Sequence, residues 1–456
     1  MPVNRRSLVA AALGLGAAAT AAKAGQIQDK RTLREAFQQL GSDIVQHLEP
    51  NAAQDQTAQL QSLIDEASAK DTPVVLPSGT FRVSDLRLRA GTRMIGQARS
   101  TILEFAGGPA FVTADKADGL VLKGLVFDGA FKAFEDGRGE GLVTLSRSSG
   151  IRIEDVEIRN SARSGLFLLA CGGRITGIDV HDALDAGIKS LDATGLEVRG
   201  NTIVSCGNNG IQVWRSEQGE DGTIVSGNRV SNIRHAAGGT GEYGNGINVF
   251  RAGSVLVQGN RISDCAYSAV RGNAASNIQI IANSCERLGE VAIYAEFGFE
   301  GALIANNLID HAATGISVTN FKEGGRLAVI QGNLIRNLFR REQEKDDKRG
   351  EGIGVEADAV ISGNTIEGAP TVGIQIGWGA FMRNVSATGN VIRRAKVGIS
   401  ITSAHEAGAC LIANNLISET KDGAIRTMSL GIVSGPDLAR DPNANGRVTV
   451  VGNVAV

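Results

Sequence analysis

Charged and aromatic side chains that could act on a carbohydrate gather in one part of the sequence, within a recurring Gly-Ile-x-Val-like phrase. Aligning the phrases gives one outward-facing column that contains Lys189, Gln212, Asn248, Arg271 and Tyr294. A second column, two residues further on, contains Trp214, Phe250 and Glu296, and Arg215 and Arg251 directly follow the two aromatic residues. Closely spaced Arg and Lys suit the carboxylates of an acidic polysaccharide, and aromatic faces suit sugar rings. The columns therefore predict a glycan site.

The chemistry expected at this site is that of a lyase or an epimerase acting on a uronate. We take as candidate catalytic residues Lys189, Arg215, Arg251, Arg271, Tyr294 and Glu296, and as candidate substrate-binding residues Trp214, Phe250, Gln212, Asn248 and Tyr243. One of the cations would neutralise the uronate carboxylate, and Tyr294, or alternatively Tyr243, would move the proton. In the competing interpretation these charges form ordinary surface pairs, such as Arg251 with Glu296, which contribute little.

Other chemistries have weaker support in the sequence. A glycoside hydrolase needs two carboxyl groups about 5–9.5 Å apart, for which the aspartate pairs 182/185 and 155/179 are the candidates. The five histidines show no ligand spacing, so we assign no metal and no cofactor. A non-catalytic carbohydrate-binding or envelope-structural protein, with Trp214, Phe250 and Trp378 as stacking surfaces, is the alternative function.

A repeat positions these residues. Gly200-Asn201-Thr202-Ile203 is followed by Gly210-Ile211-Gln212-Val213, and the same pair of phrases returns along the chain. The repeat asparagines are Asn201, Asn228, Asn260, Asn283, Asn307, Asn333, Asn364, Asn390, Asn415 and Asn453, and most successive gaps are 23 to 27 residues. Such a period, with short apolar runs and no helical periodicity, predicts a β-solenoid with three strands per coil. We expect the asparagine amides to form a ladder at one turn.

A capping element precedes the repeat. Asp55 is expected to cap a helix that extends to Lys70 and buries Leu60, Leu63 and Ile64 on one face. The stretches Val74-Val75-Leu76-Pro77-Ser78-Gly79-Thr80-Phe81 and Met94-Ile95-Gly96 follow. This opening resembles that of the pectate-lyase superfamily of right-handed parallel β-helices. The resemblance implies an all-β fold in which the helix covers the open N-terminal end of the coil.

Within that superfamily the chain is most similar to exported, twin-arginine-translocated repeat proteins whose function is not established. That resemblance implies fold and export, and it supplies no catalytic residues. The Asn-Thr-Asp and Gly-His-Gly signatures of galacturonases and the Asp-Pro-His signature of alginate epimerases are absent from the sequence.

The N-terminus has the pattern of an export signal. Arg5-Arg6 precede an apolar run that is too short to span a bilayer, and Ala22-Lys23-Ala24 offers a cleavage site. We therefore predict a signal peptide over 1–24, a linker or loose helix over 25–50 and one β-helix domain over 51–456. The arginine pair favours the twin-arginine machinery, and Sec export stays open because no phenylalanine follows the pair. A periplasmic or secreted protein without a membrane segment is expected.

The net charge of the chain limits the class of partner. A net charge of −2 argues against nucleic acid, so a polysaccharide or oligosaccharide is the expected partner, and the oligomeric state is left open.

The chain has five cysteines. Cys206 and Cys265 are expected two coils apart, roughly 9.6 Å, which exceeds the reach of a disulfide. We predict free, buried thiols.

Overall fold

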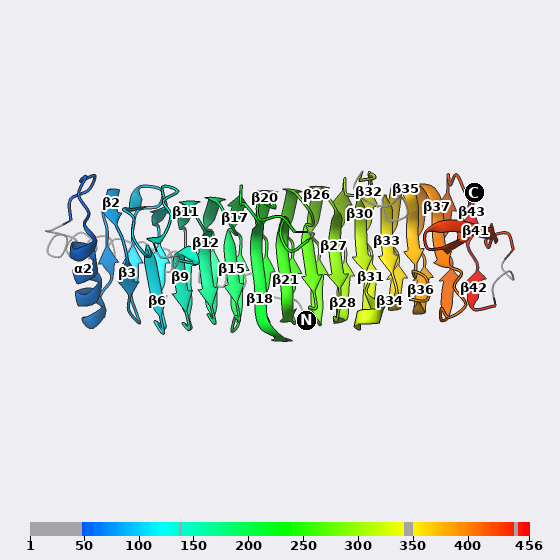
Figure 1. The fold of residues 1–456 in the computed structure, drawn as a ribbon, viewed down its shortest axis with the longest axis horizontal. Helices are drawn as coiled ribbons and strands as arrows, with labels where there is room; N and C mark the ends of the chain where they lie inside the picture. Colours follow the sequence, from blue (N-terminus) through cyan, green and yellow to red (C-terminus); the bar gives the residue numbers. More distant parts are fainter. Residues whose placement is uncertain (1–47, 136–138, 240, 342–349, 442–445) are drawn as a thin grey trace, which may run out of the picture.

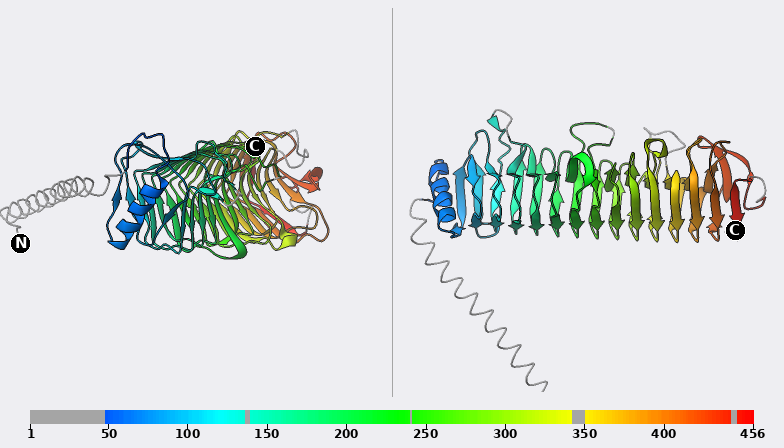
Figure 2. Two further views of the ribbon diagram at one scale, coloured as in Figure 1. Left: turned by 60° about the vertical axis from the view of Figure 1, so that its left-hand side comes forward. Right: turned by 90° about the horizontal axis from the view of Figure 1, so that it is seen from below.

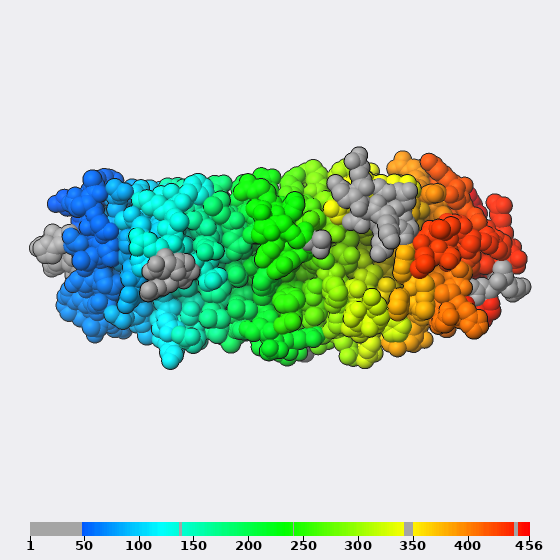
Figure 3. Space-filling model, in the orientation of Figure 1, coloured from blue at the N-terminus to red at the C-terminus, as the bar shows by residue number. Residues whose placement is uncertain are grey.

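The protein is a long coil of short parallel strands, closed at its N-terminal end by a helix (Figure 1). The computed structural model describes residues 48–135, 139–239, 241–341, 350–441 and 446–456. The predicted signal peptide and most of the predicted linker lie outside these residues. Successive coils pack into one continuous rod (Figure 3). None of the helices within the described ranges is long and apolar enough to cross a membrane.

Each coil contributes strands to three stacks, which belong to a 15-stranded and a 28-stranded sheet. The first stack contains β1 (Val74–Val75), β4 (Arg93–Ile95), β7 (Val121–Lys123), β10 (Ile151–Glu154), β13 (Gly173–Thr176), β16 (Leu196–Arg199), β19 (Ile224–Ser226), β22 (Leu256–Gln258), β25 (Ile278–Ile281), β28 (Glu300–Ala305), β31 (Arg326–Gln331), β34 (Ala357–Ser362), β36 (Arg383–Thr388), β38 (Cys410–Ala413) and β42 (Val448–Val451). The second stack contains β2 (Gly79–Val83), β5 (Thr101–Phe105), β8 (Val126–Asp128), β11 (Glu157–Ser161), β14 (Asp179–Ala183), β17 (Thr202–Val204), β20 (Arg229–Ile233), β23 (Arg261–Cys265), β26 (Ser284–Leu288), β29 (Leu308–Asp310), β32 (Leu334–Arg336), β39 (Leu416–Ser418) and β43 (Val454–Ala455).

The third stack forms the face on which the predicted columns lie. It contains β3 (Leu86–Leu88), β6 (Val112–Asp115), β9 (Gly141–Ser146), β12 (Ser164–Leu169), β15 (Ile188–Leu191), β18 (Asn209–Glu220), β21 (Asn245–Gly253), β24 (Val270–Asn273), β27 (Val291–Glu296), β30 (Thr314–Val318), β33 (Glu351–Val355) and β40 (Ile425–Ser429). The long strands β35 (Thr365–Ile376) and β37 (Val391–Thr402) belong to both the second and the third stack. A short 3-10 helix, η2 (Phe321–Glu323), follows β30.

Nearly all the pairing is parallel, and β41 (Ile432–Asp437) pairs antiparallel with β40 near the C-terminal end. Longer connections leave the coil along one edge, while the opposite edge is flat (Figure 2). Side chains alternate between the interior and the outside, so each coil adds branched aliphatic residues such as Ile203 and Val230 to a continuous core. The predicted right-handed parallel β-helix with an N-terminal capping helix is confirmed.

The capping helix α2 spans Thr57–Ala69 and buries Leu60, Leu63 and Ile64 against the first coil, as the apolar spacing predicts. Its start differs from the expectation, because Gln56 occupies the N-cap position. Asp55 lies one residue earlier, and its Oδ1 accepts a hydrogen bond from the Thr57 amide at 2.7 Å. The helix removes the open end of the coil, where unpaired strands would otherwise recruit other chains.

The repeat asparagines form the predicted ladder at the turn between the first and second stacks. Asn260 Oδ1 accepts hydrogen bonds from both the amide N–H and Nδ2 of Asn228, each at 2.9 Å. Asn260 Nδ2 in turn donates to Asn283 Oδ1 and to the carbonyl of Val225, each at 3.0 Å. The same pattern continues to Asn453, and the ladder asparagines before it are buried. Buried amide groups are costly unless paired, and each side chain pairs the groups of its neighbour.

The five cysteines are free and buried, as predicted. Ile233 on β20 pairs with Cys265 on β23, which puts one coil between Cys265 and Cys206. Burial raises the pKa of Cys206 and of Cys285 to about 12. These thiols therefore act as small apolar core residues.

Candidate functional site

The predicted outward column exists with the predicted register. Lys189 pairs with Gln212, Gln212 with Asn248, Asn248 with Arg271, and Arg271 with Tyr294, on the successive strands β15, β18, β21, β24 and β27. Neighbouring strands of one stack lie about 4.8 Å apart, so Lys189 and Arg271 are separated by about 14 Å along the coil. The predicted cations are therefore spread along the third stack and do not converge at one point.

Two members of this column are covered, although they face outward. Gln212 is 1% exposed and Asn248 is 4% exposed. Trp214 Nε1 donates to Asn248 Oδ1 at 2.9 Å, and Asn248 Nδ2 donates to the carbonyl of Glu242 at 3.2 Å. The indole ring and the connection before β21 thus close this part of the face. Direct contact of these two amides with a glycan is excluded in this conformation.

The aromatic residues Trp214 and Phe250 pack edge to face, with their ring centroids 5.8 Å apart. The Lys189 ammonium lies 5.8 Å from the Trp214 ring and 5.6 Å from the Phe167 ring, and 3.6 Å from a Glu140 carboxylate oxygen. The cation of Lys189 is therefore shared between two rings and a carboxylate.

The predicted cations Arg215 and Arg251 turn away from the column. Arg251 Nη1 donates to the carbonyl of Ser216 at 2.8 Å, and its guanidinium lies 4.9 Å from the Phe250 ring. The anticipated pair of Arg251 with Glu296 is replaced by Arg271 with Glu296. Arg215 lies near the buried Asp221, whose pKa is raised by burial even though Thr223 and Arg215 act in the opposite direction.

Tyr243, the alternative proton carrier, lies in the connection before β21. Burial raises the pKa of its hydroxyl, and the neighbouring carboxylate of Glu242 raises it further. Tyr243 therefore stays protonated near neutral pH, where a proton acceptor of this type would have to be ionised.

Arg271 is the centre of a buried ionic cluster. Its Nε and Nη2 contact the two oxygens of Glu296 at 2.7 and 3.1 Å, and its Nη1 lies 3.4 Å from Glu290 Oε2. The guanidinium also lies 4.8 Å from the Tyr294 ring, and Asn273 Nδ2 donates to Glu296 Oε1 at 3.1 Å. The side chains of Arg271 and Glu296 are only 11% and 5% exposed. Arg271, Tyr294 and Glu296 are neighbours in the predicted columns and lie together here, whereas Glu290 lies outside both columns.

The same cluster controls the protonation of Tyr294. Burial raises the pKa of its hydroxyl well above the usual range, and the negative charges of Glu296 and Glu290 raise it further. Although burial alone would lower the pKa of Arg271, the two glutamates raise it overall. At neutral pH the tyrosine is neutral and the arginine is charged and paired.

A pocket of about 240 Å³ opens beside this cluster, over β27, β30, β33 and β35. The pocket exists because the side chains of the outward column become smaller from Tyr294 to Ser317 and Gly354. The next side chain in the column, Gln375, is large again. A Cβ at position 354 would lie 3.6 Å from Glu351 Oε2, so the Glu351 carboxylate reaches over this floor.

Carboxylates and an aromatic ring wall the pocket. Glu290 directly precedes β27 and Glu351 begins β33, whereas Glu296 ends β27 and Glu356 directly follows β33. Trp378 forms part of the same wall, where a tight turn holds it through an antiparallel bridge to Phe381. Glu356 Oε2 accepts a hydrogen bond from the Phe321 amide at 2.6 Å, and Arg341 Nη1 lies 3.5 Å from Glu290 Oε1.

Of these residues, Trp378 is predicted from the sequence as a stacking surface, whereas the pocket itself is not predicted. The signal in the sequence that could have revealed the pocket is the pair of small residues, Ser317 and Gly354, in the outward column beside these larger side chains. Three of the four aspartates considered for hydrolysis have other partners, and Asp179 Oδ2 lies 3.4 Å from Arg99 Nη2. Asp185 accepts from Ser164 and Asn208, and Asp182 contacts His181 Nδ1 at 2.8 Å.

Comparison with known proteins gives two family matches. Residues 217–392 match the family described as right handed beta helix region, and residues 132–285 match the family described as periplasmic copper-binding protein (NosD). No curated protein matches the chain.

Similar solved structures include the N-terminal fragment of gene product 12 of bacteriophage Phi29, at 14% identity and a TM-score of 0.55, with 94% of this chain and 74% of that chain covered. Others are a GH87 alpha-1,3-glucanase from Streptomyces thermodiastaticus, at 15% identity, TM-score 0.48, and 91% and 68% coverage, and a PL6 alginate lyase complexed with a trisaccharide, at 14% identity, TM-score 0.49, and 89% and 94% coverage. The family match over residues 217–392 and the similarity to the Phi29 protein support the right-handed β-helix fold.

The copper named in one family description does not fit this chain. Copper prefers thiolate, thioether and imidazole ligands, which have to converge. Across the described ranges, no three His, Cys, Asp or Glu side chains are grouped to hold a metal ion. The cysteines within the matched region are buried, and burial raises the pKa of each. We therefore derive no step that involves copper.

Proposed function

We propose that this right-handed β-helix protein binds a polysaccharide across the third stack and seats one sugar residue in the pocket between Glu290 and Trp378. The observation that supports this proposal is the combination of a concave floor, an aromatic wall and several carboxylates in about 240 Å³. An aromatic ring offers an apolar surface to the face of a sugar, and carboxylates accept hydrogen bonds from its hydroxyl groups. The lining of the pocket contains both kinds of group.

The charge of the pocket favours a neutral glycan. Among the described residues, four glutamates and one arginine, Arg341, line it. A uronate carboxylate placed there would lie among like charges in a partly desolvated site, which raises the free energy of binding. Hydroxyl groups would instead find charged acceptors, and hydrogen bonds to charged acceptors are stronger than neutral ones.

Lyase or epimerase chemistry on an acidic glycan is the second candidate. It needs a cation that can face the uronate and an acceptor that is ionised near neutral pH. Arg271 is already held by Glu296 and Glu290, and Tyr294 has a raised pKa. Lys189 lies about 14 Å away along the coil. The arrangement therefore favours glycan binding over proton abstraction at these residues.

The proposal includes export. The signal predicted over 1–24 would carry the protein out of the cytoplasm, through the twin-arginine machinery or through Sec, to where polysaccharides are found. Protein recovered from the periplasm or the medium should then begin at Gly25. Recovery of the uncut chain in the cytoplasm alone would contradict export and leave the site proposal standing.

The purified protein should be tested against a panel of neutral and uronate-containing glycans for retention, new reducing ends and unsaturated products. We expect retention on a neutral glycan, and at least a tenfold rise in Kd, about 1.4 kcal/mol, for Trp378→Ala and for Glu356→Gln. Phe131→Ala and Glu300→Gln are matched controls, because both residues are exposed and lie outside the pocket. Absence of retention on every glycan, or equal losses in the controls, would overturn the proposal. Product formation would make the site catalytic.

A further inference from the structure

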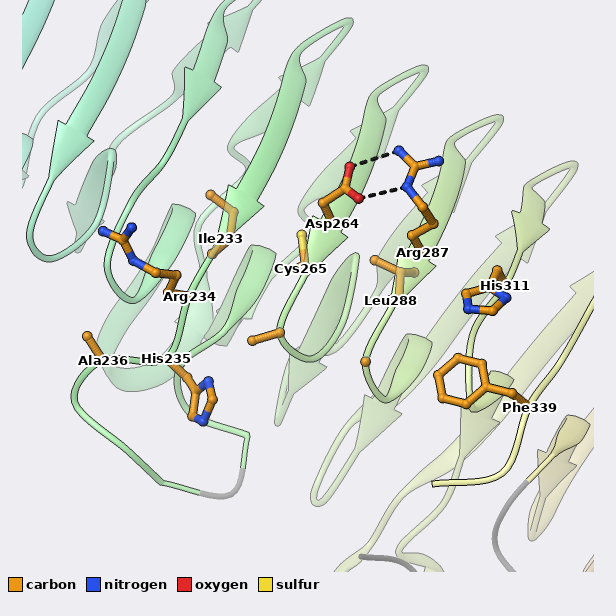
Figure 4. A pocket seen from close by; sticks show the side chains of 12 residues that line it. Ile233, Arg234, His235, Ala236, Asp264, Cys265, Arg287, Leu288, His311 and Phe339 are labelled. Atoms are coloured by element: carbon orange, nitrogen blue, oxygen red, sulfur yellow. Dashed lines mark hydrogen bonds and ion pairs between the residues drawn. The ribbon is translucent and has the colours of Figure 1, made fainter. Parts of the chain in front are cut away.

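A second hollow lies on the edge of the coil, at the turn between the second and third stacks. It has a volume of about 740 Å³, and Figure 4 shows how its side chains follow successive coils. Its lining includes two small residues, Ala266 and Gly289, which are here called its floor. His235 and Phe339 stand at its two ends, four coils apart, which corresponds to about 19 Å. The small floor residues and the larger ends give it the shape of a trough.

A third hollow, of about 610 Å³, continues this trough along the same edge. Phe339 lines the first trough, and the next residue, Arg340, lines the second. The second extends over the coils of Ala369, Ala395 and Lys421. The two hollows lie in line at the same turn of eight successive coils, from His235 to Lys421, a length of roughly 34 Å, and are together called the edge groove. A groove of this length suits an extended polymer.

The edge groove has an excess of positive charge. Its cations are Arg234, Arg287, Arg340, Arg394, Lys396 and Lys421. Its carboxylates are those of Asp264, Glu419 and Asp422, so the described lining has a net charge of +3. Two of its cations have partners on the coil, because Arg394 contacts Glu367 at 2.5 Å and Lys396 contacts Asp422 at 3.7 Å. Asp264 is engaged by Arg287 through two contacts of 2.7 and 2.8 Å, which Figure 4 shows as dashed lines. The pocket on the third stack, by contrast, is acidic.

The density of this charge identifies the class of polymer. Three excess charges over roughly 34 Å correspond to one in about 11 Å, whereas one nucleic-acid strand has a phosphate about every 3.4 Å. A nucleic acid would also require a basic protein face, and the chain has a net charge of −2. A sparsely charged polyanion matches the groove better.

Aromatic rings lie along the first trough at two places. The His311 and Phe339 rings are 4.8 Å apart, and the His235 and Tyr267 rings are 5.0 Å apart. His235, His311 and Phe339 line the trough directly, and the residues of its floor are small and apolar. Rings and an apolar floor suit sugar rings, while the cations suit carboxylates or sulfates.

We infer that the edge groove binds an anionic polysaccharide in an extended conformation. This site is separate from the pocket on the third stack and does not depend on the function proposed for it. Phe339 lines the first trough, Arg340 lines the second trough and Arg341 lines the pocket. The groove and the pocket are therefore neighbours at these three consecutive residues.

The test uses polygalacturonate as the probe, with dextran as an uncharged polymer and single-stranded DNA as a dense polyanion. The exposed residues Arg394 and Lys421 are replaced together by alanine. We expect the Kd for polygalacturonate to rise at least tenfold and its dependence on salt to weaken, because two ionic contacts are removed. The matched control is Arg229→Ala with Arg261→Ala, which removes the same charge from exposed positions outside the groove.

The outcomes separate the possibilities. The groove is supported if the Kd for polygalacturonate rises in Arg394→Ala/Lys421→Ala but is unchanged in the control variant. An unchanged Kd for polygalacturonate in Trp378→Ala sets the groove apart from the pocket. Failure of the unaltered protein to bind polygalacturonate overturns the inference. Equal losses in the groove and control variants also overturn it, as does DNA binding of the same affinity and the same sensitivity to these substitutions.

Discussion

Replacing Arg271 by alanine is expected to lower the free energy of unfolding by about 3–5 kcal/mol, because it leaves a buried carboxylate without its cation. Glu296 is 5% exposed, and its contacts with Arg271 at 2.7 and 3.1 Å are its only ones with a cation in the described part of the chain. Glu290 loses one of its partners in the same variant. Removing one member of a buried ion pair lowers the free energy of unfolding by more than the intact pair contributes to it.

Urea unfolding monitored by circular dichroism measures this loss. Arg287→Ala is the matched control, because Arg287 makes a similar two-contact pair with Asp264 but is about half exposed. The control should lose much less stability, because an exposed ion pair contributes little. Adding Glu296→Gln to Arg271→Ala should restore part of the stability, since it removes the unpaired charge. A loss in Arg271→Ala no larger than in the control would show that the cluster is solvated and not buried.

Replacing Asn283 by alanine is expected to cost about 2–4 kcal/mol. Its Oδ1 accepts from the amide N–H and from Nδ2 of Asn260, each at 3.0 Å, and its Nδ2 donates to the carbonyl of Val257 and to Asn307 Oδ1. Alanine leaves two donors of Asn260 without a partner, and each unsatisfied buried group costs about 1–3 kcal/mol.

The neighbouring turn offers a control with the same residue type. Asn306 is exposed and has a φ of 57°, so Asn306→Gly should change stability by no more than about 0.5 kcal/mol. Hydrogen exchange gives a local readout, because the amide of Asn260 should lose protection in Asn283→Ala. Unchanged protection there would show that the ladder does not hold the turn.

The β-helix itself is largely determined by the sequence. A recurring Gly-Asn-x-Ile phrase requires the same turn in each coil, and stacking equal turns pairs equal positions. This is why alignment alone gives the register of Lys189 with Gln212 and of Arg271 with Tyr294. The apolar spacing of Leu60, Leu63 and Ile64 likewise determines the face of the cap, and the coil spacing keeps the cysteines apart.

Only the tertiary structure decided which outward side chains are accessible and how they are paired. The Trp214 ring and the connection before β21 hold Asn248, and Gln212 beside it is buried, which a one-dimensional alignment has no means of showing. Glu290 reaches Arg271 although it lies outside both columns. The pocket and the edge groove result from small residues set among large ones on coils some 25 residues apart. The strand register follows from the repeated backbone geometry. The partners of a side chain depend instead on the direction in which it points and on insertions, and both differ from coil to coil.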